Sequence, residues 1–293
     1  MAFTHYIATE IAADYADGLV SRREALRRLA LVGLGAGSAS AVLAACSGGV
    51  PRSTAAPGQV STAEAPSGGT AEVLAFSGPA GQLRAAWAGA AEPRGAVLVI
   101  HENRGLTDHF KALPRRFAAD GYSALAVDLL SREGGTGSFP DPAEATAALA
   151  AAPAERLVAD LSAGIDELER RVAGQRVGAV GFCFGGGLTW ELLNAGEARL
   201  AAAVPFYGPL PASPDFSRAK AAVLAIYAEL DARVNRSRDA AATALDRAHL
   251  VHEIMTFPGV DHAFFNDTGP RYNARAAAEA YRAVLGWFAR YLQ

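Results

Sequence analysis

From about residue 70 onward, short apolar runs alternate with longer segments in which apolar positions recur at helical spacing. The runs predict strands, in chain order, at 72–77, 82–87, 97–101, 123–128, 175–182, 201–207, 221–228 and 252–257. The helical spacing predicts helices at 108–120, 143–173 with a break near Pro153, 186–195 and 272–291. A Gly-Pro-Ala-Gly turn between the first two strands is typical of a hairpin. The alternation that follows predicts a single α/β domain: a mainly parallel, doubly wound sheet with its ligand crevice at the carboxyl ends of the strands.

The segment Gly181-Phe-Cys183-Phe-Gly185 lies between the fifth predicted strand and the helix that follows it. This is the strand–turn–helix context of the nucleophile elbow G-x-S-x-G, with a thiol in place of the serine. The sharp turn favours flanking residues without a Cβ, and the start of the helix presents backbone N–H groups to an oxyanion. Cys183 is therefore the candidate nucleophile. The alternative is a small buried cysteine packed in a glycine-rich turn.

A thiol nucleophile needs a base, and the base needs a carboxylate to orient it. In an elbow-containing α/β fold the acid and then the histidine follow the nucleophile, each in the loop after a strand. Asp231 follows the seventh predicted strand, 48 residues after Cys183, and His262 follows the eighth, another 31 residues on. These two residues are the candidate acid and base. Glu229 and Asp261 are rivals for the acid, Asp231 could instead be a turn or helix-capping residue, and His262 could be an ordinary loop residue.

The third predicted strand ends in His101-Glu102-Asn103. The loop after this strand supplies the second oxyanion N–H in an α/β-hydrolase, so Asn103 is the candidate for that donor. Phe184, as the residue after the nucleophile, is the candidate for the first. Glu102 points to acid chemistry in the same crevice, although a glutamate at a strand end is usually just solvated.

Four segments together resemble the dienelactone hydrolase family: Gly-Phe-Cys-Phe-Gly-Gly at 181–186, His-Glu-Asn-Arg-Gly-Leu at 101–106, Val-Asp-Leu-Leu-Ser-Arg at 127–132 and Gly-Val-Asp-His-Ala-Phe at 259–264. The resemblance covers roughly residues 70–293 and implies an α/β-hydrolase fold. The cysteine elbow is the most specific of the four, because most α/β-hydrolases carry serine there.

The resemblance also implies roles for single residues. The triad of the family corresponds to Cys183, Asp231 and His262. The glutamate that meets the resting thiol in the family, and helps to activate it, corresponds to Glu102. The first arginine for a substrate carboxylate corresponds to Arg132. Asn266 stands where the family has its second arginine, so we expect neutral or singly charged small esters to be better substrates than dienelactone.

The amino terminus has the pattern of an export signal. Arg22 and Arg23 resemble a twin-arginine motif, and 17 uncharged residues follow at 29–45. Leu-Ala-Ala-Cys46 resembles a bacterial lipobox, which predicts cleavage before Cys46 and lipid attachment to it. The alternative is an uncleaved helix with an incidental cysteine. We therefore expect residues 1–45 to lie outside the fold and the protein to be a periplasmic or cell-surface lipoprotein.

Residues 46–69 are mainly Ser, Ala, Pro, Thr and Gly, a composition that predicts a flexible tether to a domain at 70–293. A net charge of −3 with both signs interspersed gives no support to nucleic-acid binding. The two cysteines have separate predicted roles, so no disulfide is expected. We expect no metal or cofactor, a membrane association through the lipid only, and a monomer.

These patterns predict a cysteine-nucleophile hydrolase for small esters or lactones. Two other hypotheses remain open. One is a thioesterase or peptidase on the same fold, since crevice shape selects the acyl group. The other is a non-enzymatic surface lipoprotein that only binds a ligand, which has no need of a complete triad.

Overall fold

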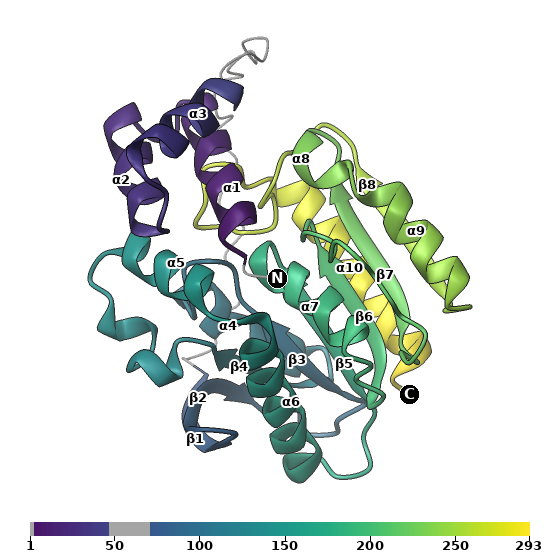
Figure 1. Cartoon of the computed structure of the whole chain (residues 1–293). Coiled ribbons are helices and arrows are strands. Elements are labelled where there is room, and N and C mark those ends of the chain that lie inside the picture. The colour runs from purple at the N-terminus through teal and green to yellow at the C-terminus, as the bar shows by residue number, and fades with distance from the viewer. Residues whose placement is uncertain (1–2, 47–70) are drawn as a thin grey trace.

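The computed structural model describes residues 3–46 and 71–293. Within the second range, eight strands form one sheet in the order β1-β2-β4-β3-β5-β6-β7-β8 (Figure 1). The strands β1 and β2 form an antiparallel hairpin, β2 pairs antiparallel with β4, and the remaining pairs are parallel. The bounds are β1 Glu72–Gly78, β2 Gly81–Ala88, β3 Ala96–Ile100, β4 Ser123–Asp128, β5 Val177–Phe182, β6 Leu200–Phe206, β7 Ala222–Ala228 and β8 His252–Phe257.

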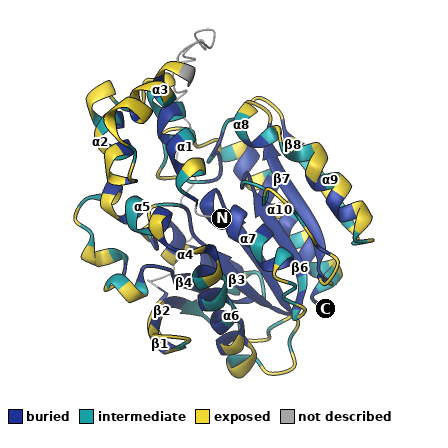
Figure 2. Ribbon diagram, viewed as in Figure 1, coloured by how far each residue is buried: buried dark blue, intermediate teal, exposed yellow. Residues whose placement is uncertain are grey.

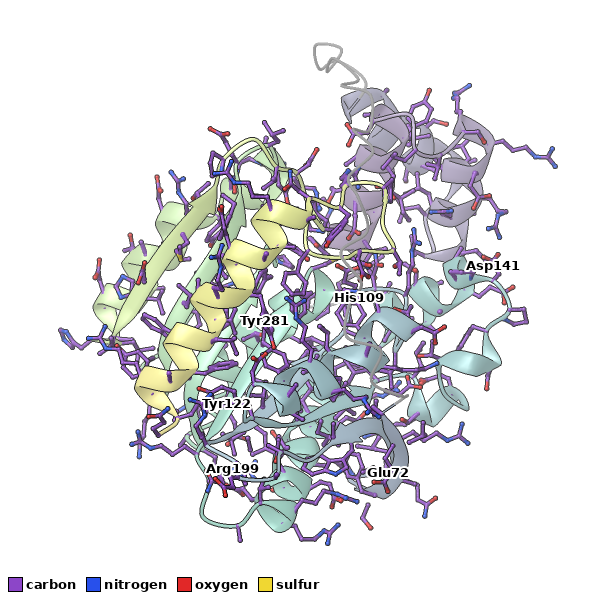
Figure 3. All side chains as sticks on the ribbon, turned by 180° about the vertical axis from the view of Figure 1, so that it is seen from behind. Glu72, His109, Tyr122, Asp141, Arg199 and Tyr281 are labelled. Atoms are coloured by element: carbon purple, nitrogen blue, oxygen red, sulfur yellow. The ribbon has the colours of Figure 1, made fainter. Side chains whose placement is uncertain are left out.

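Helices cover both faces of this sheet. The helices α6 and α7 pack on each other and on β3 and β5, while α4 and α10 meet through aromatic rings on the opposite face, which is in front in Figure 3. There the Tyr281 hydroxyl of α10 donates to Asp120 at the end of α4, at 2.8 Å. The helix bounds in this part of the chain are α4 Asp108–Ala119, α5 Pro142–Ala151, α6 Ala154–Arg171, α7 Phe184–Asn194, α8 Ala232–Asn235, α9 Arg238–Arg247 and α10 Ala274–Tyr291.

Burial explains why the predicted strands were recognisable. Every residue of β3, β4, β5 and β7 is buried, as continuous apolar runs require of strands covered on both faces (Figure 2). The predicted hairpin and the helix break at Pro153 are confirmed. The short helix α8 was not predicted. The helix α9 is the crossover between β7 and β8, for which the 31 residues between Asp231 and His262 leave room.

The amino-terminal segment differs from its prediction. Residues 1–45 were expected to lie outside the fold, but the described part forms α1 Thr4–Ala16, α2 Arg22–Leu31 and α3 Ala36–Cys46. These three helices pack on one another, and α1 and α2 also pack on α5. Asp141, which is labelled in Figure 3, immediately precedes α5. Arg27 of α2 pairs with Asp141 at 2.6 Å, and Ile7 and Ile11 of α1 are buried. In the uncharged stretch that suggested a signal segment, Leu29, Val32 and Leu43 are buried as well, so this stretch also contributes to the packing.

Two parts of the amino-terminal prediction are not described by the structure. The tether at 47–69 and the side chain of Cys46 lie outside the described residues. None of the described helices combines the length and the apolar character needed to cross a membrane. Export and lipid attachment stay predictions.

Candidate active site

Cys183 lies in a strained turn between β5 and α7. Its φ of 55° and ψ of −114° are unusual for a residue with a side chain. A Cβ on Gly181 would lie 2.1 Å from the Gly185 carbonyl oxygen, and one on Gly185 would lie 2.3 Å from that of Ile100. The two flanking positions therefore accept only glycine. The thiol lies at the carboxyl edge of the sheet because β5 ends at Phe182, α7 begins at Phe184, and the glycines on either side allow so tight a turn between them.

Asp231 and His262 meet at the same edge from the ends of β7 and β8. Asp231 Oδ2 lies 2.6 Å from His262 Nδ1, and both side chains are buried. Asp231 also accepts the Val234 N–H at 3.1 Å, so the carboxylate caps α8 and orients the imidazole at once. Burial alone would raise the pKa of Asp231, but the charge of His262 and its hydrogen bond outweigh burial and lower it to about 2.

The two rival carboxylates have other partners. Glu229 accepts the Gly259 backbone N–H at 2.6 Å. Asp261 accepts the backbone N–H of His262 at 2.7 Å rather than a ring nitrogen. Among these three acids, Asp231 is the one whose carboxylate is hydrogen-bonded to the imidazole of His262.

Glu102 and Asn103 follow β3 into the same region. Glu102 is buried, where it accepts from the Asn266 amide at 2.8 Å and from the Tyr207 hydroxyl at 3.5 Å. Burial raises the pKa of Glu102. Phe184 begins α7 directly after the thiol, so its backbone N–H and that of Asn103 belong to the two segments that flank Cys183.

The two residues assigned to substrate carboxylate binding have protein partners. Arg132 forms an ion pair with the buried carboxylate of Asp160 on α6. Asn266 donates to Glu102, as described above. The resemblance therefore located Asn266 in the site, but it did not indicate the hydrogen bond to Glu102. Nor did it indicate the ion pair between Arg132 and Asp160.

Four residues near the triad were not predicted. Tyr207 packs edge-on against the His262 ring, with centroids 5.0 Å apart. The Arg233 guanidinium lies 3.4 Å from His262 Nδ1. Tyr6 and Glu10 come from α1, in the segment that was expected to lie outside the fold. For Arg233 the signal was its position two residues after Asp231. For the other three, nothing local in the sequence indicates the contact.

The thiol itself is closed off by Tyr6 and Glu10. Cys183 is 1% exposed, its sulfur lies 3.4 Å from the Tyr6 hydroxyl, and Glu10 oxygens lie 3.5 and 3.6 Å away. The same hydroxyl is 3.5 Å from His262 Nε2. Burial raises the pKa of the Cys183 thiol well above its ordinary value, and the Glu10 and Glu102 carboxylates raise it further. In this arrangement the raised pKa favours the protonated thiol of Cys183.

One group of side chains among the described residues has donor atoms close enough to share a metal ion. The sulfur of Cys183, a nitrogen of His262 and an oxygen of Glu10 lie within 4.8 Å of one another. Thiolate, imidazole and carboxylate are donors that Zn²⁺ accepts. An ion bound there would occupy the candidate nucleophile and the candidate base, so it would inhibit acyl transfer to the thiol rather than assist it.

The eight-stranded sheet, the elbow after β5, the acid after β7 and the histidine after β8 define the class of the protein, the α/β-hydrolases. The family model of the dienelactone hydrolase family matches residues 83–292. The chain therefore belongs to the dienelactone hydrolase family and is a hydrolase.

Curated relatives and solved structures agree with this family. The chain is 33% identical over 213 residues to a putative carboxymethylenebutenolidase of Escherichia coli O157:H7, covering 68% of this chain and 78% of the relative. A putative dienelactone hydrolase from Klebsiella pneumoniae has a similar structure, with a TM-score of 0.67, 29% identity, and coverage of 75% of this chain and 98% of that one. A dienelactone hydrolase-like promiscuous phosphotriesterase from metagenomic libraries has a TM-score of 0.58 at 26% identity, over 76% of this chain and 99% of that one.

Proposed function

We propose that this hydrolase cleaves small esters or lactones through a Cys183–His262–Asp231 triad. The observation that carries the proposal is the 2.6 Å contact between Asp231 and the His262 ring at the sheet edge that bears the Cys183 elbow. The names of the Escherichia coli and Klebsiella relatives support lactones as one substrate class.

The proposed reaction is acyl transfer to sulfur and then to water. His262, held by Asp231, takes the proton of Cys183, and the thiolate attacks the carbonyl carbon. The backbone N–H groups of Asn103 and Phe184 stabilise the oxyanion, each contributing on the order of 3 kcal/mol. The leaving alcohol takes the proton from His262, which then deprotonates the water that hydrolyses the thioester.

Glu102 is proposed to assist the thiol. Burial raises the pKa of Glu102, so its carboxyl group can gain or lose a proton more readily near neutral pH than an exposed glutamate can. When Glu102 is ionised, its negative charge raises the pKa of Cys183 and so opposes thiolate formation. A Glu102 carboxyl group that is neutral when the substrate binds therefore favours the thiolate more than an ionised one does.

The proposed substrate preference follows from the two positions that the resemblance assigns to binding of a substrate carboxylate. Asn266 carries no charge, and Arg132 is already paired with Asp160. A lost charge-assisted hydrogen bond costs roughly 1.5–3 kcal/mol, or about 10- to 150-fold in affinity. We therefore expect dienelactone to be hydrolysed with a lower kcat/KM than a neutral lactone of similar size.

A panel of neutral esters and lactones, dienelactone, thioesters and short peptides tests both the activity and the preference. The expected result is ester and lactone hydrolysis with a thioester adduct on Cys183 after an acid quench, detected by mass spectrometry. A strong preference for dienelactone would contradict the predicted substrate class. Turnover of thioesters or peptides alone would favour a thioesterase or peptidase on this fold. No turnover of any substrate, by protein cleaved after folding to remove the amino-terminal segment, would favour a ligand-binding protein.

We propose further that the chain is exported and lipidated at Cys46. The twin-arginine pattern, the uncharged stretch at 29–45 and the lipobox-like sequence support this. Cys46→Ala is expected to leave the protein exported but free of the membrane fraction, and replacing Arg22 and Arg23 with lysine is expected to halt export. The matched control replaces Arg27 and Arg28 with lysine. Membrane association of Cys46→Ala would mean that another segment anchors the protein.

A further inference from the structure

The helix α1 lies across the carboxyl edge of the sheet, beside the start of α7 and the loop that precedes α10 (Figure 1). The apolar side of α1 is buried at Ile7 and Ile11. The Thr4 hydroxyl donates to the Ala150 carbonyl oxygen of α5 at 3.2 Å. Contacts of this helix with residues 71–293 run from Thr4 through Tyr6 to Asp14, so the helix is not held at one end alone.

The residues of α1 and its cap reach the catalytic groups themselves. The Tyr6 hydroxyl is within hydrogen-bond distance of both the Cys183 sulfur and His262 Nε2. Glu10 contacts the same sulfur and accepts from the Asn103 side-chain amide at 3.0 Å. A reacting carbonyl carbon must come within about 3–3.5 Å of the sulfur, which is the space that Tyr6 and Glu10 fill.

The first turn of α7 is shaped to receive the residue before α1. Phe3 packs on the Phe184 ring, with centroids 4.6 Å apart. A Cβ on Gly187 would lie 2.9 Å from the Phe3 ring, so the glycine leaves the room that Phe3 occupies. Phe184, whose backbone N–H is a predicted oxyanion donor, therefore also packs against Phe3 through its ring.

Charge complementarity holds the other end of α1. Arg271, in the loop before α10, pairs with Asp14 at 2.9 Å and with Asp17 at 2.7 Å. The Arg233 guanidinium lies over the Tyr6 ring, 4.6 Å from its centroid, in a cation–π contact. Acidic and aromatic residues of α1 thus face cationic residues of the catalytic domain.

We propose that the mouth of the active site is a docking surface for the chain's own α1, and that ester or lactone substrates reach Cys183 only after α1 has left. The inference rests on the proposed function of Cys183 as the nucleophile. Cleavage before Cys46, as the export prediction requires, would remove α1, α2 and α3 together. The uncleaved chain is then a masked precursor, and removal of the segment produces the active enzyme.

The first test uses the full chain with a specific protease site placed within residues 52–66. The folded protein is assayed before and after cleavage, at a concentration at which size exclusion shows that the amino-terminal segment has separated. Two rates are measured: hydrolysis of a neutral ester, and alkylation of Cys183 by iodoacetamide, quantified on the peptide that contains it. Both are expected to rise at least 10-fold on cleavage.

A second test loosens α1 without cutting the chain. Asp14→Asn combined with Asp17→Asn removes both ion pairs to Arg271 and is expected to raise the alkylation and hydrolysis rates severalfold. Glu24→Gln is the matched control, because this carboxylate pairs with Arg27 and Arg28 inside α2. The control is expected to leave both rates unchanged.

The two readouts separate the inference from the function on which it rests. Faster alkylation without hydrolysis of any ester would uphold docking and overturn the proposed function. Hydrolysis and alkylation that proceed at the same rates before and after cleavage would overturn docking. A fall in hydrolysis after separation would also overturn it, because α1 would then be part of the active enzyme.

Discussion

Replacing Cys183 with alanine is expected to abolish ester and lactone hydrolysis, with a fall in kcat/KM of at least about 10³-fold. The reason is that the acyl group has no other acceptor at the elbow, while the oxyanion donors alone give only residual catalysis. Removing a single buried sulfur leaves a small void, so stability should change by about 1 kcal/mol and the Tm by a few degrees. Initial rates and thermal unfolding of the purified variant measure both effects.

The matched control for this variant is Cys46→Ala, which removes the other cysteine of the chain. It is expected to hydrolyse esters at the same rate as the wild-type protein in the same form, uncleaved or cleaved after folding. Cys183→Ser is expected to retain little activity, because a serine hydroxyl is far less acidic than the thiol for which the base is arranged. Undiminished hydrolysis by Cys183→Ala would end the assignment of the nucleophile.

Asp231→Asn is expected to lower kcat/KM by roughly 10³- to 10⁴-fold. An asparagine amide would donate to His262 Nδ1, which forces the imidazole proton onto Nε2, the atom that must accept the proton from Cys183. The overall fold should persist, since Asn can still cap α8 through its carbonyl oxygen. Single-turnover kinetics across pH would show whether the loss is in acylation.

Asp261→Asn is the matched control for this second variant, because it makes the same chemical change one residue before His262. Its carboxylate contacts the backbone N–H of His262 and not the ring. We expect less than a 10-fold loss. A larger loss in Asp261→Asn than in Asp231→Asn would reverse the assignment of the acid.

Masking by α1 affects how these variants are measured. In the uncleaved chain the wild-type rate is already low if α1 must leave before substrate enters, so both comparisons are sharpest in protein cleaved after folding. The ratio of the Cys183 alkylation rates after and before cleavage reports the removal of the mask in each variant.

The local sequence by itself determined the sheet, the elbow and the order of the catalytic candidates. Continuous apolar runs predict strands wherever both faces are covered, and the backbone of the turn at Cys183 admits only glycine beside it. Because parallel strands end at one edge, three residues far apart in sequence could be assigned to one crevice.

Contacts between distant segments were decided only by the tertiary structure. The sequence preferred Asp231 but left Glu229 and Asp261 as rivals, since spacing does not reveal which carboxylate points at the imidazole. The resemblance assigned Arg132 to the substrate, and only the folded chain shows that it also pairs with Asp160 on another element. A local motif specifies the backbone position of a residue, but the partner of its side chain depends on packing between distant elements.

The amino-terminal helix is the clearest case. The arginine pair and the uncharged stretch at 29–45 predicted an export signal that includes residues 1–28, whereas α1 lies against the site. Hydrophobic periodicity indicates a buried face without identifying what covers it. Tyr6 and Glu10 lie more than 170 residues from Cys183, and nothing near them in sequence marks a catalytic contact. Strands and turns follow from short-range sterics and burial, whereas the closure of this active site follows from long-range docking that only the folded chain defines.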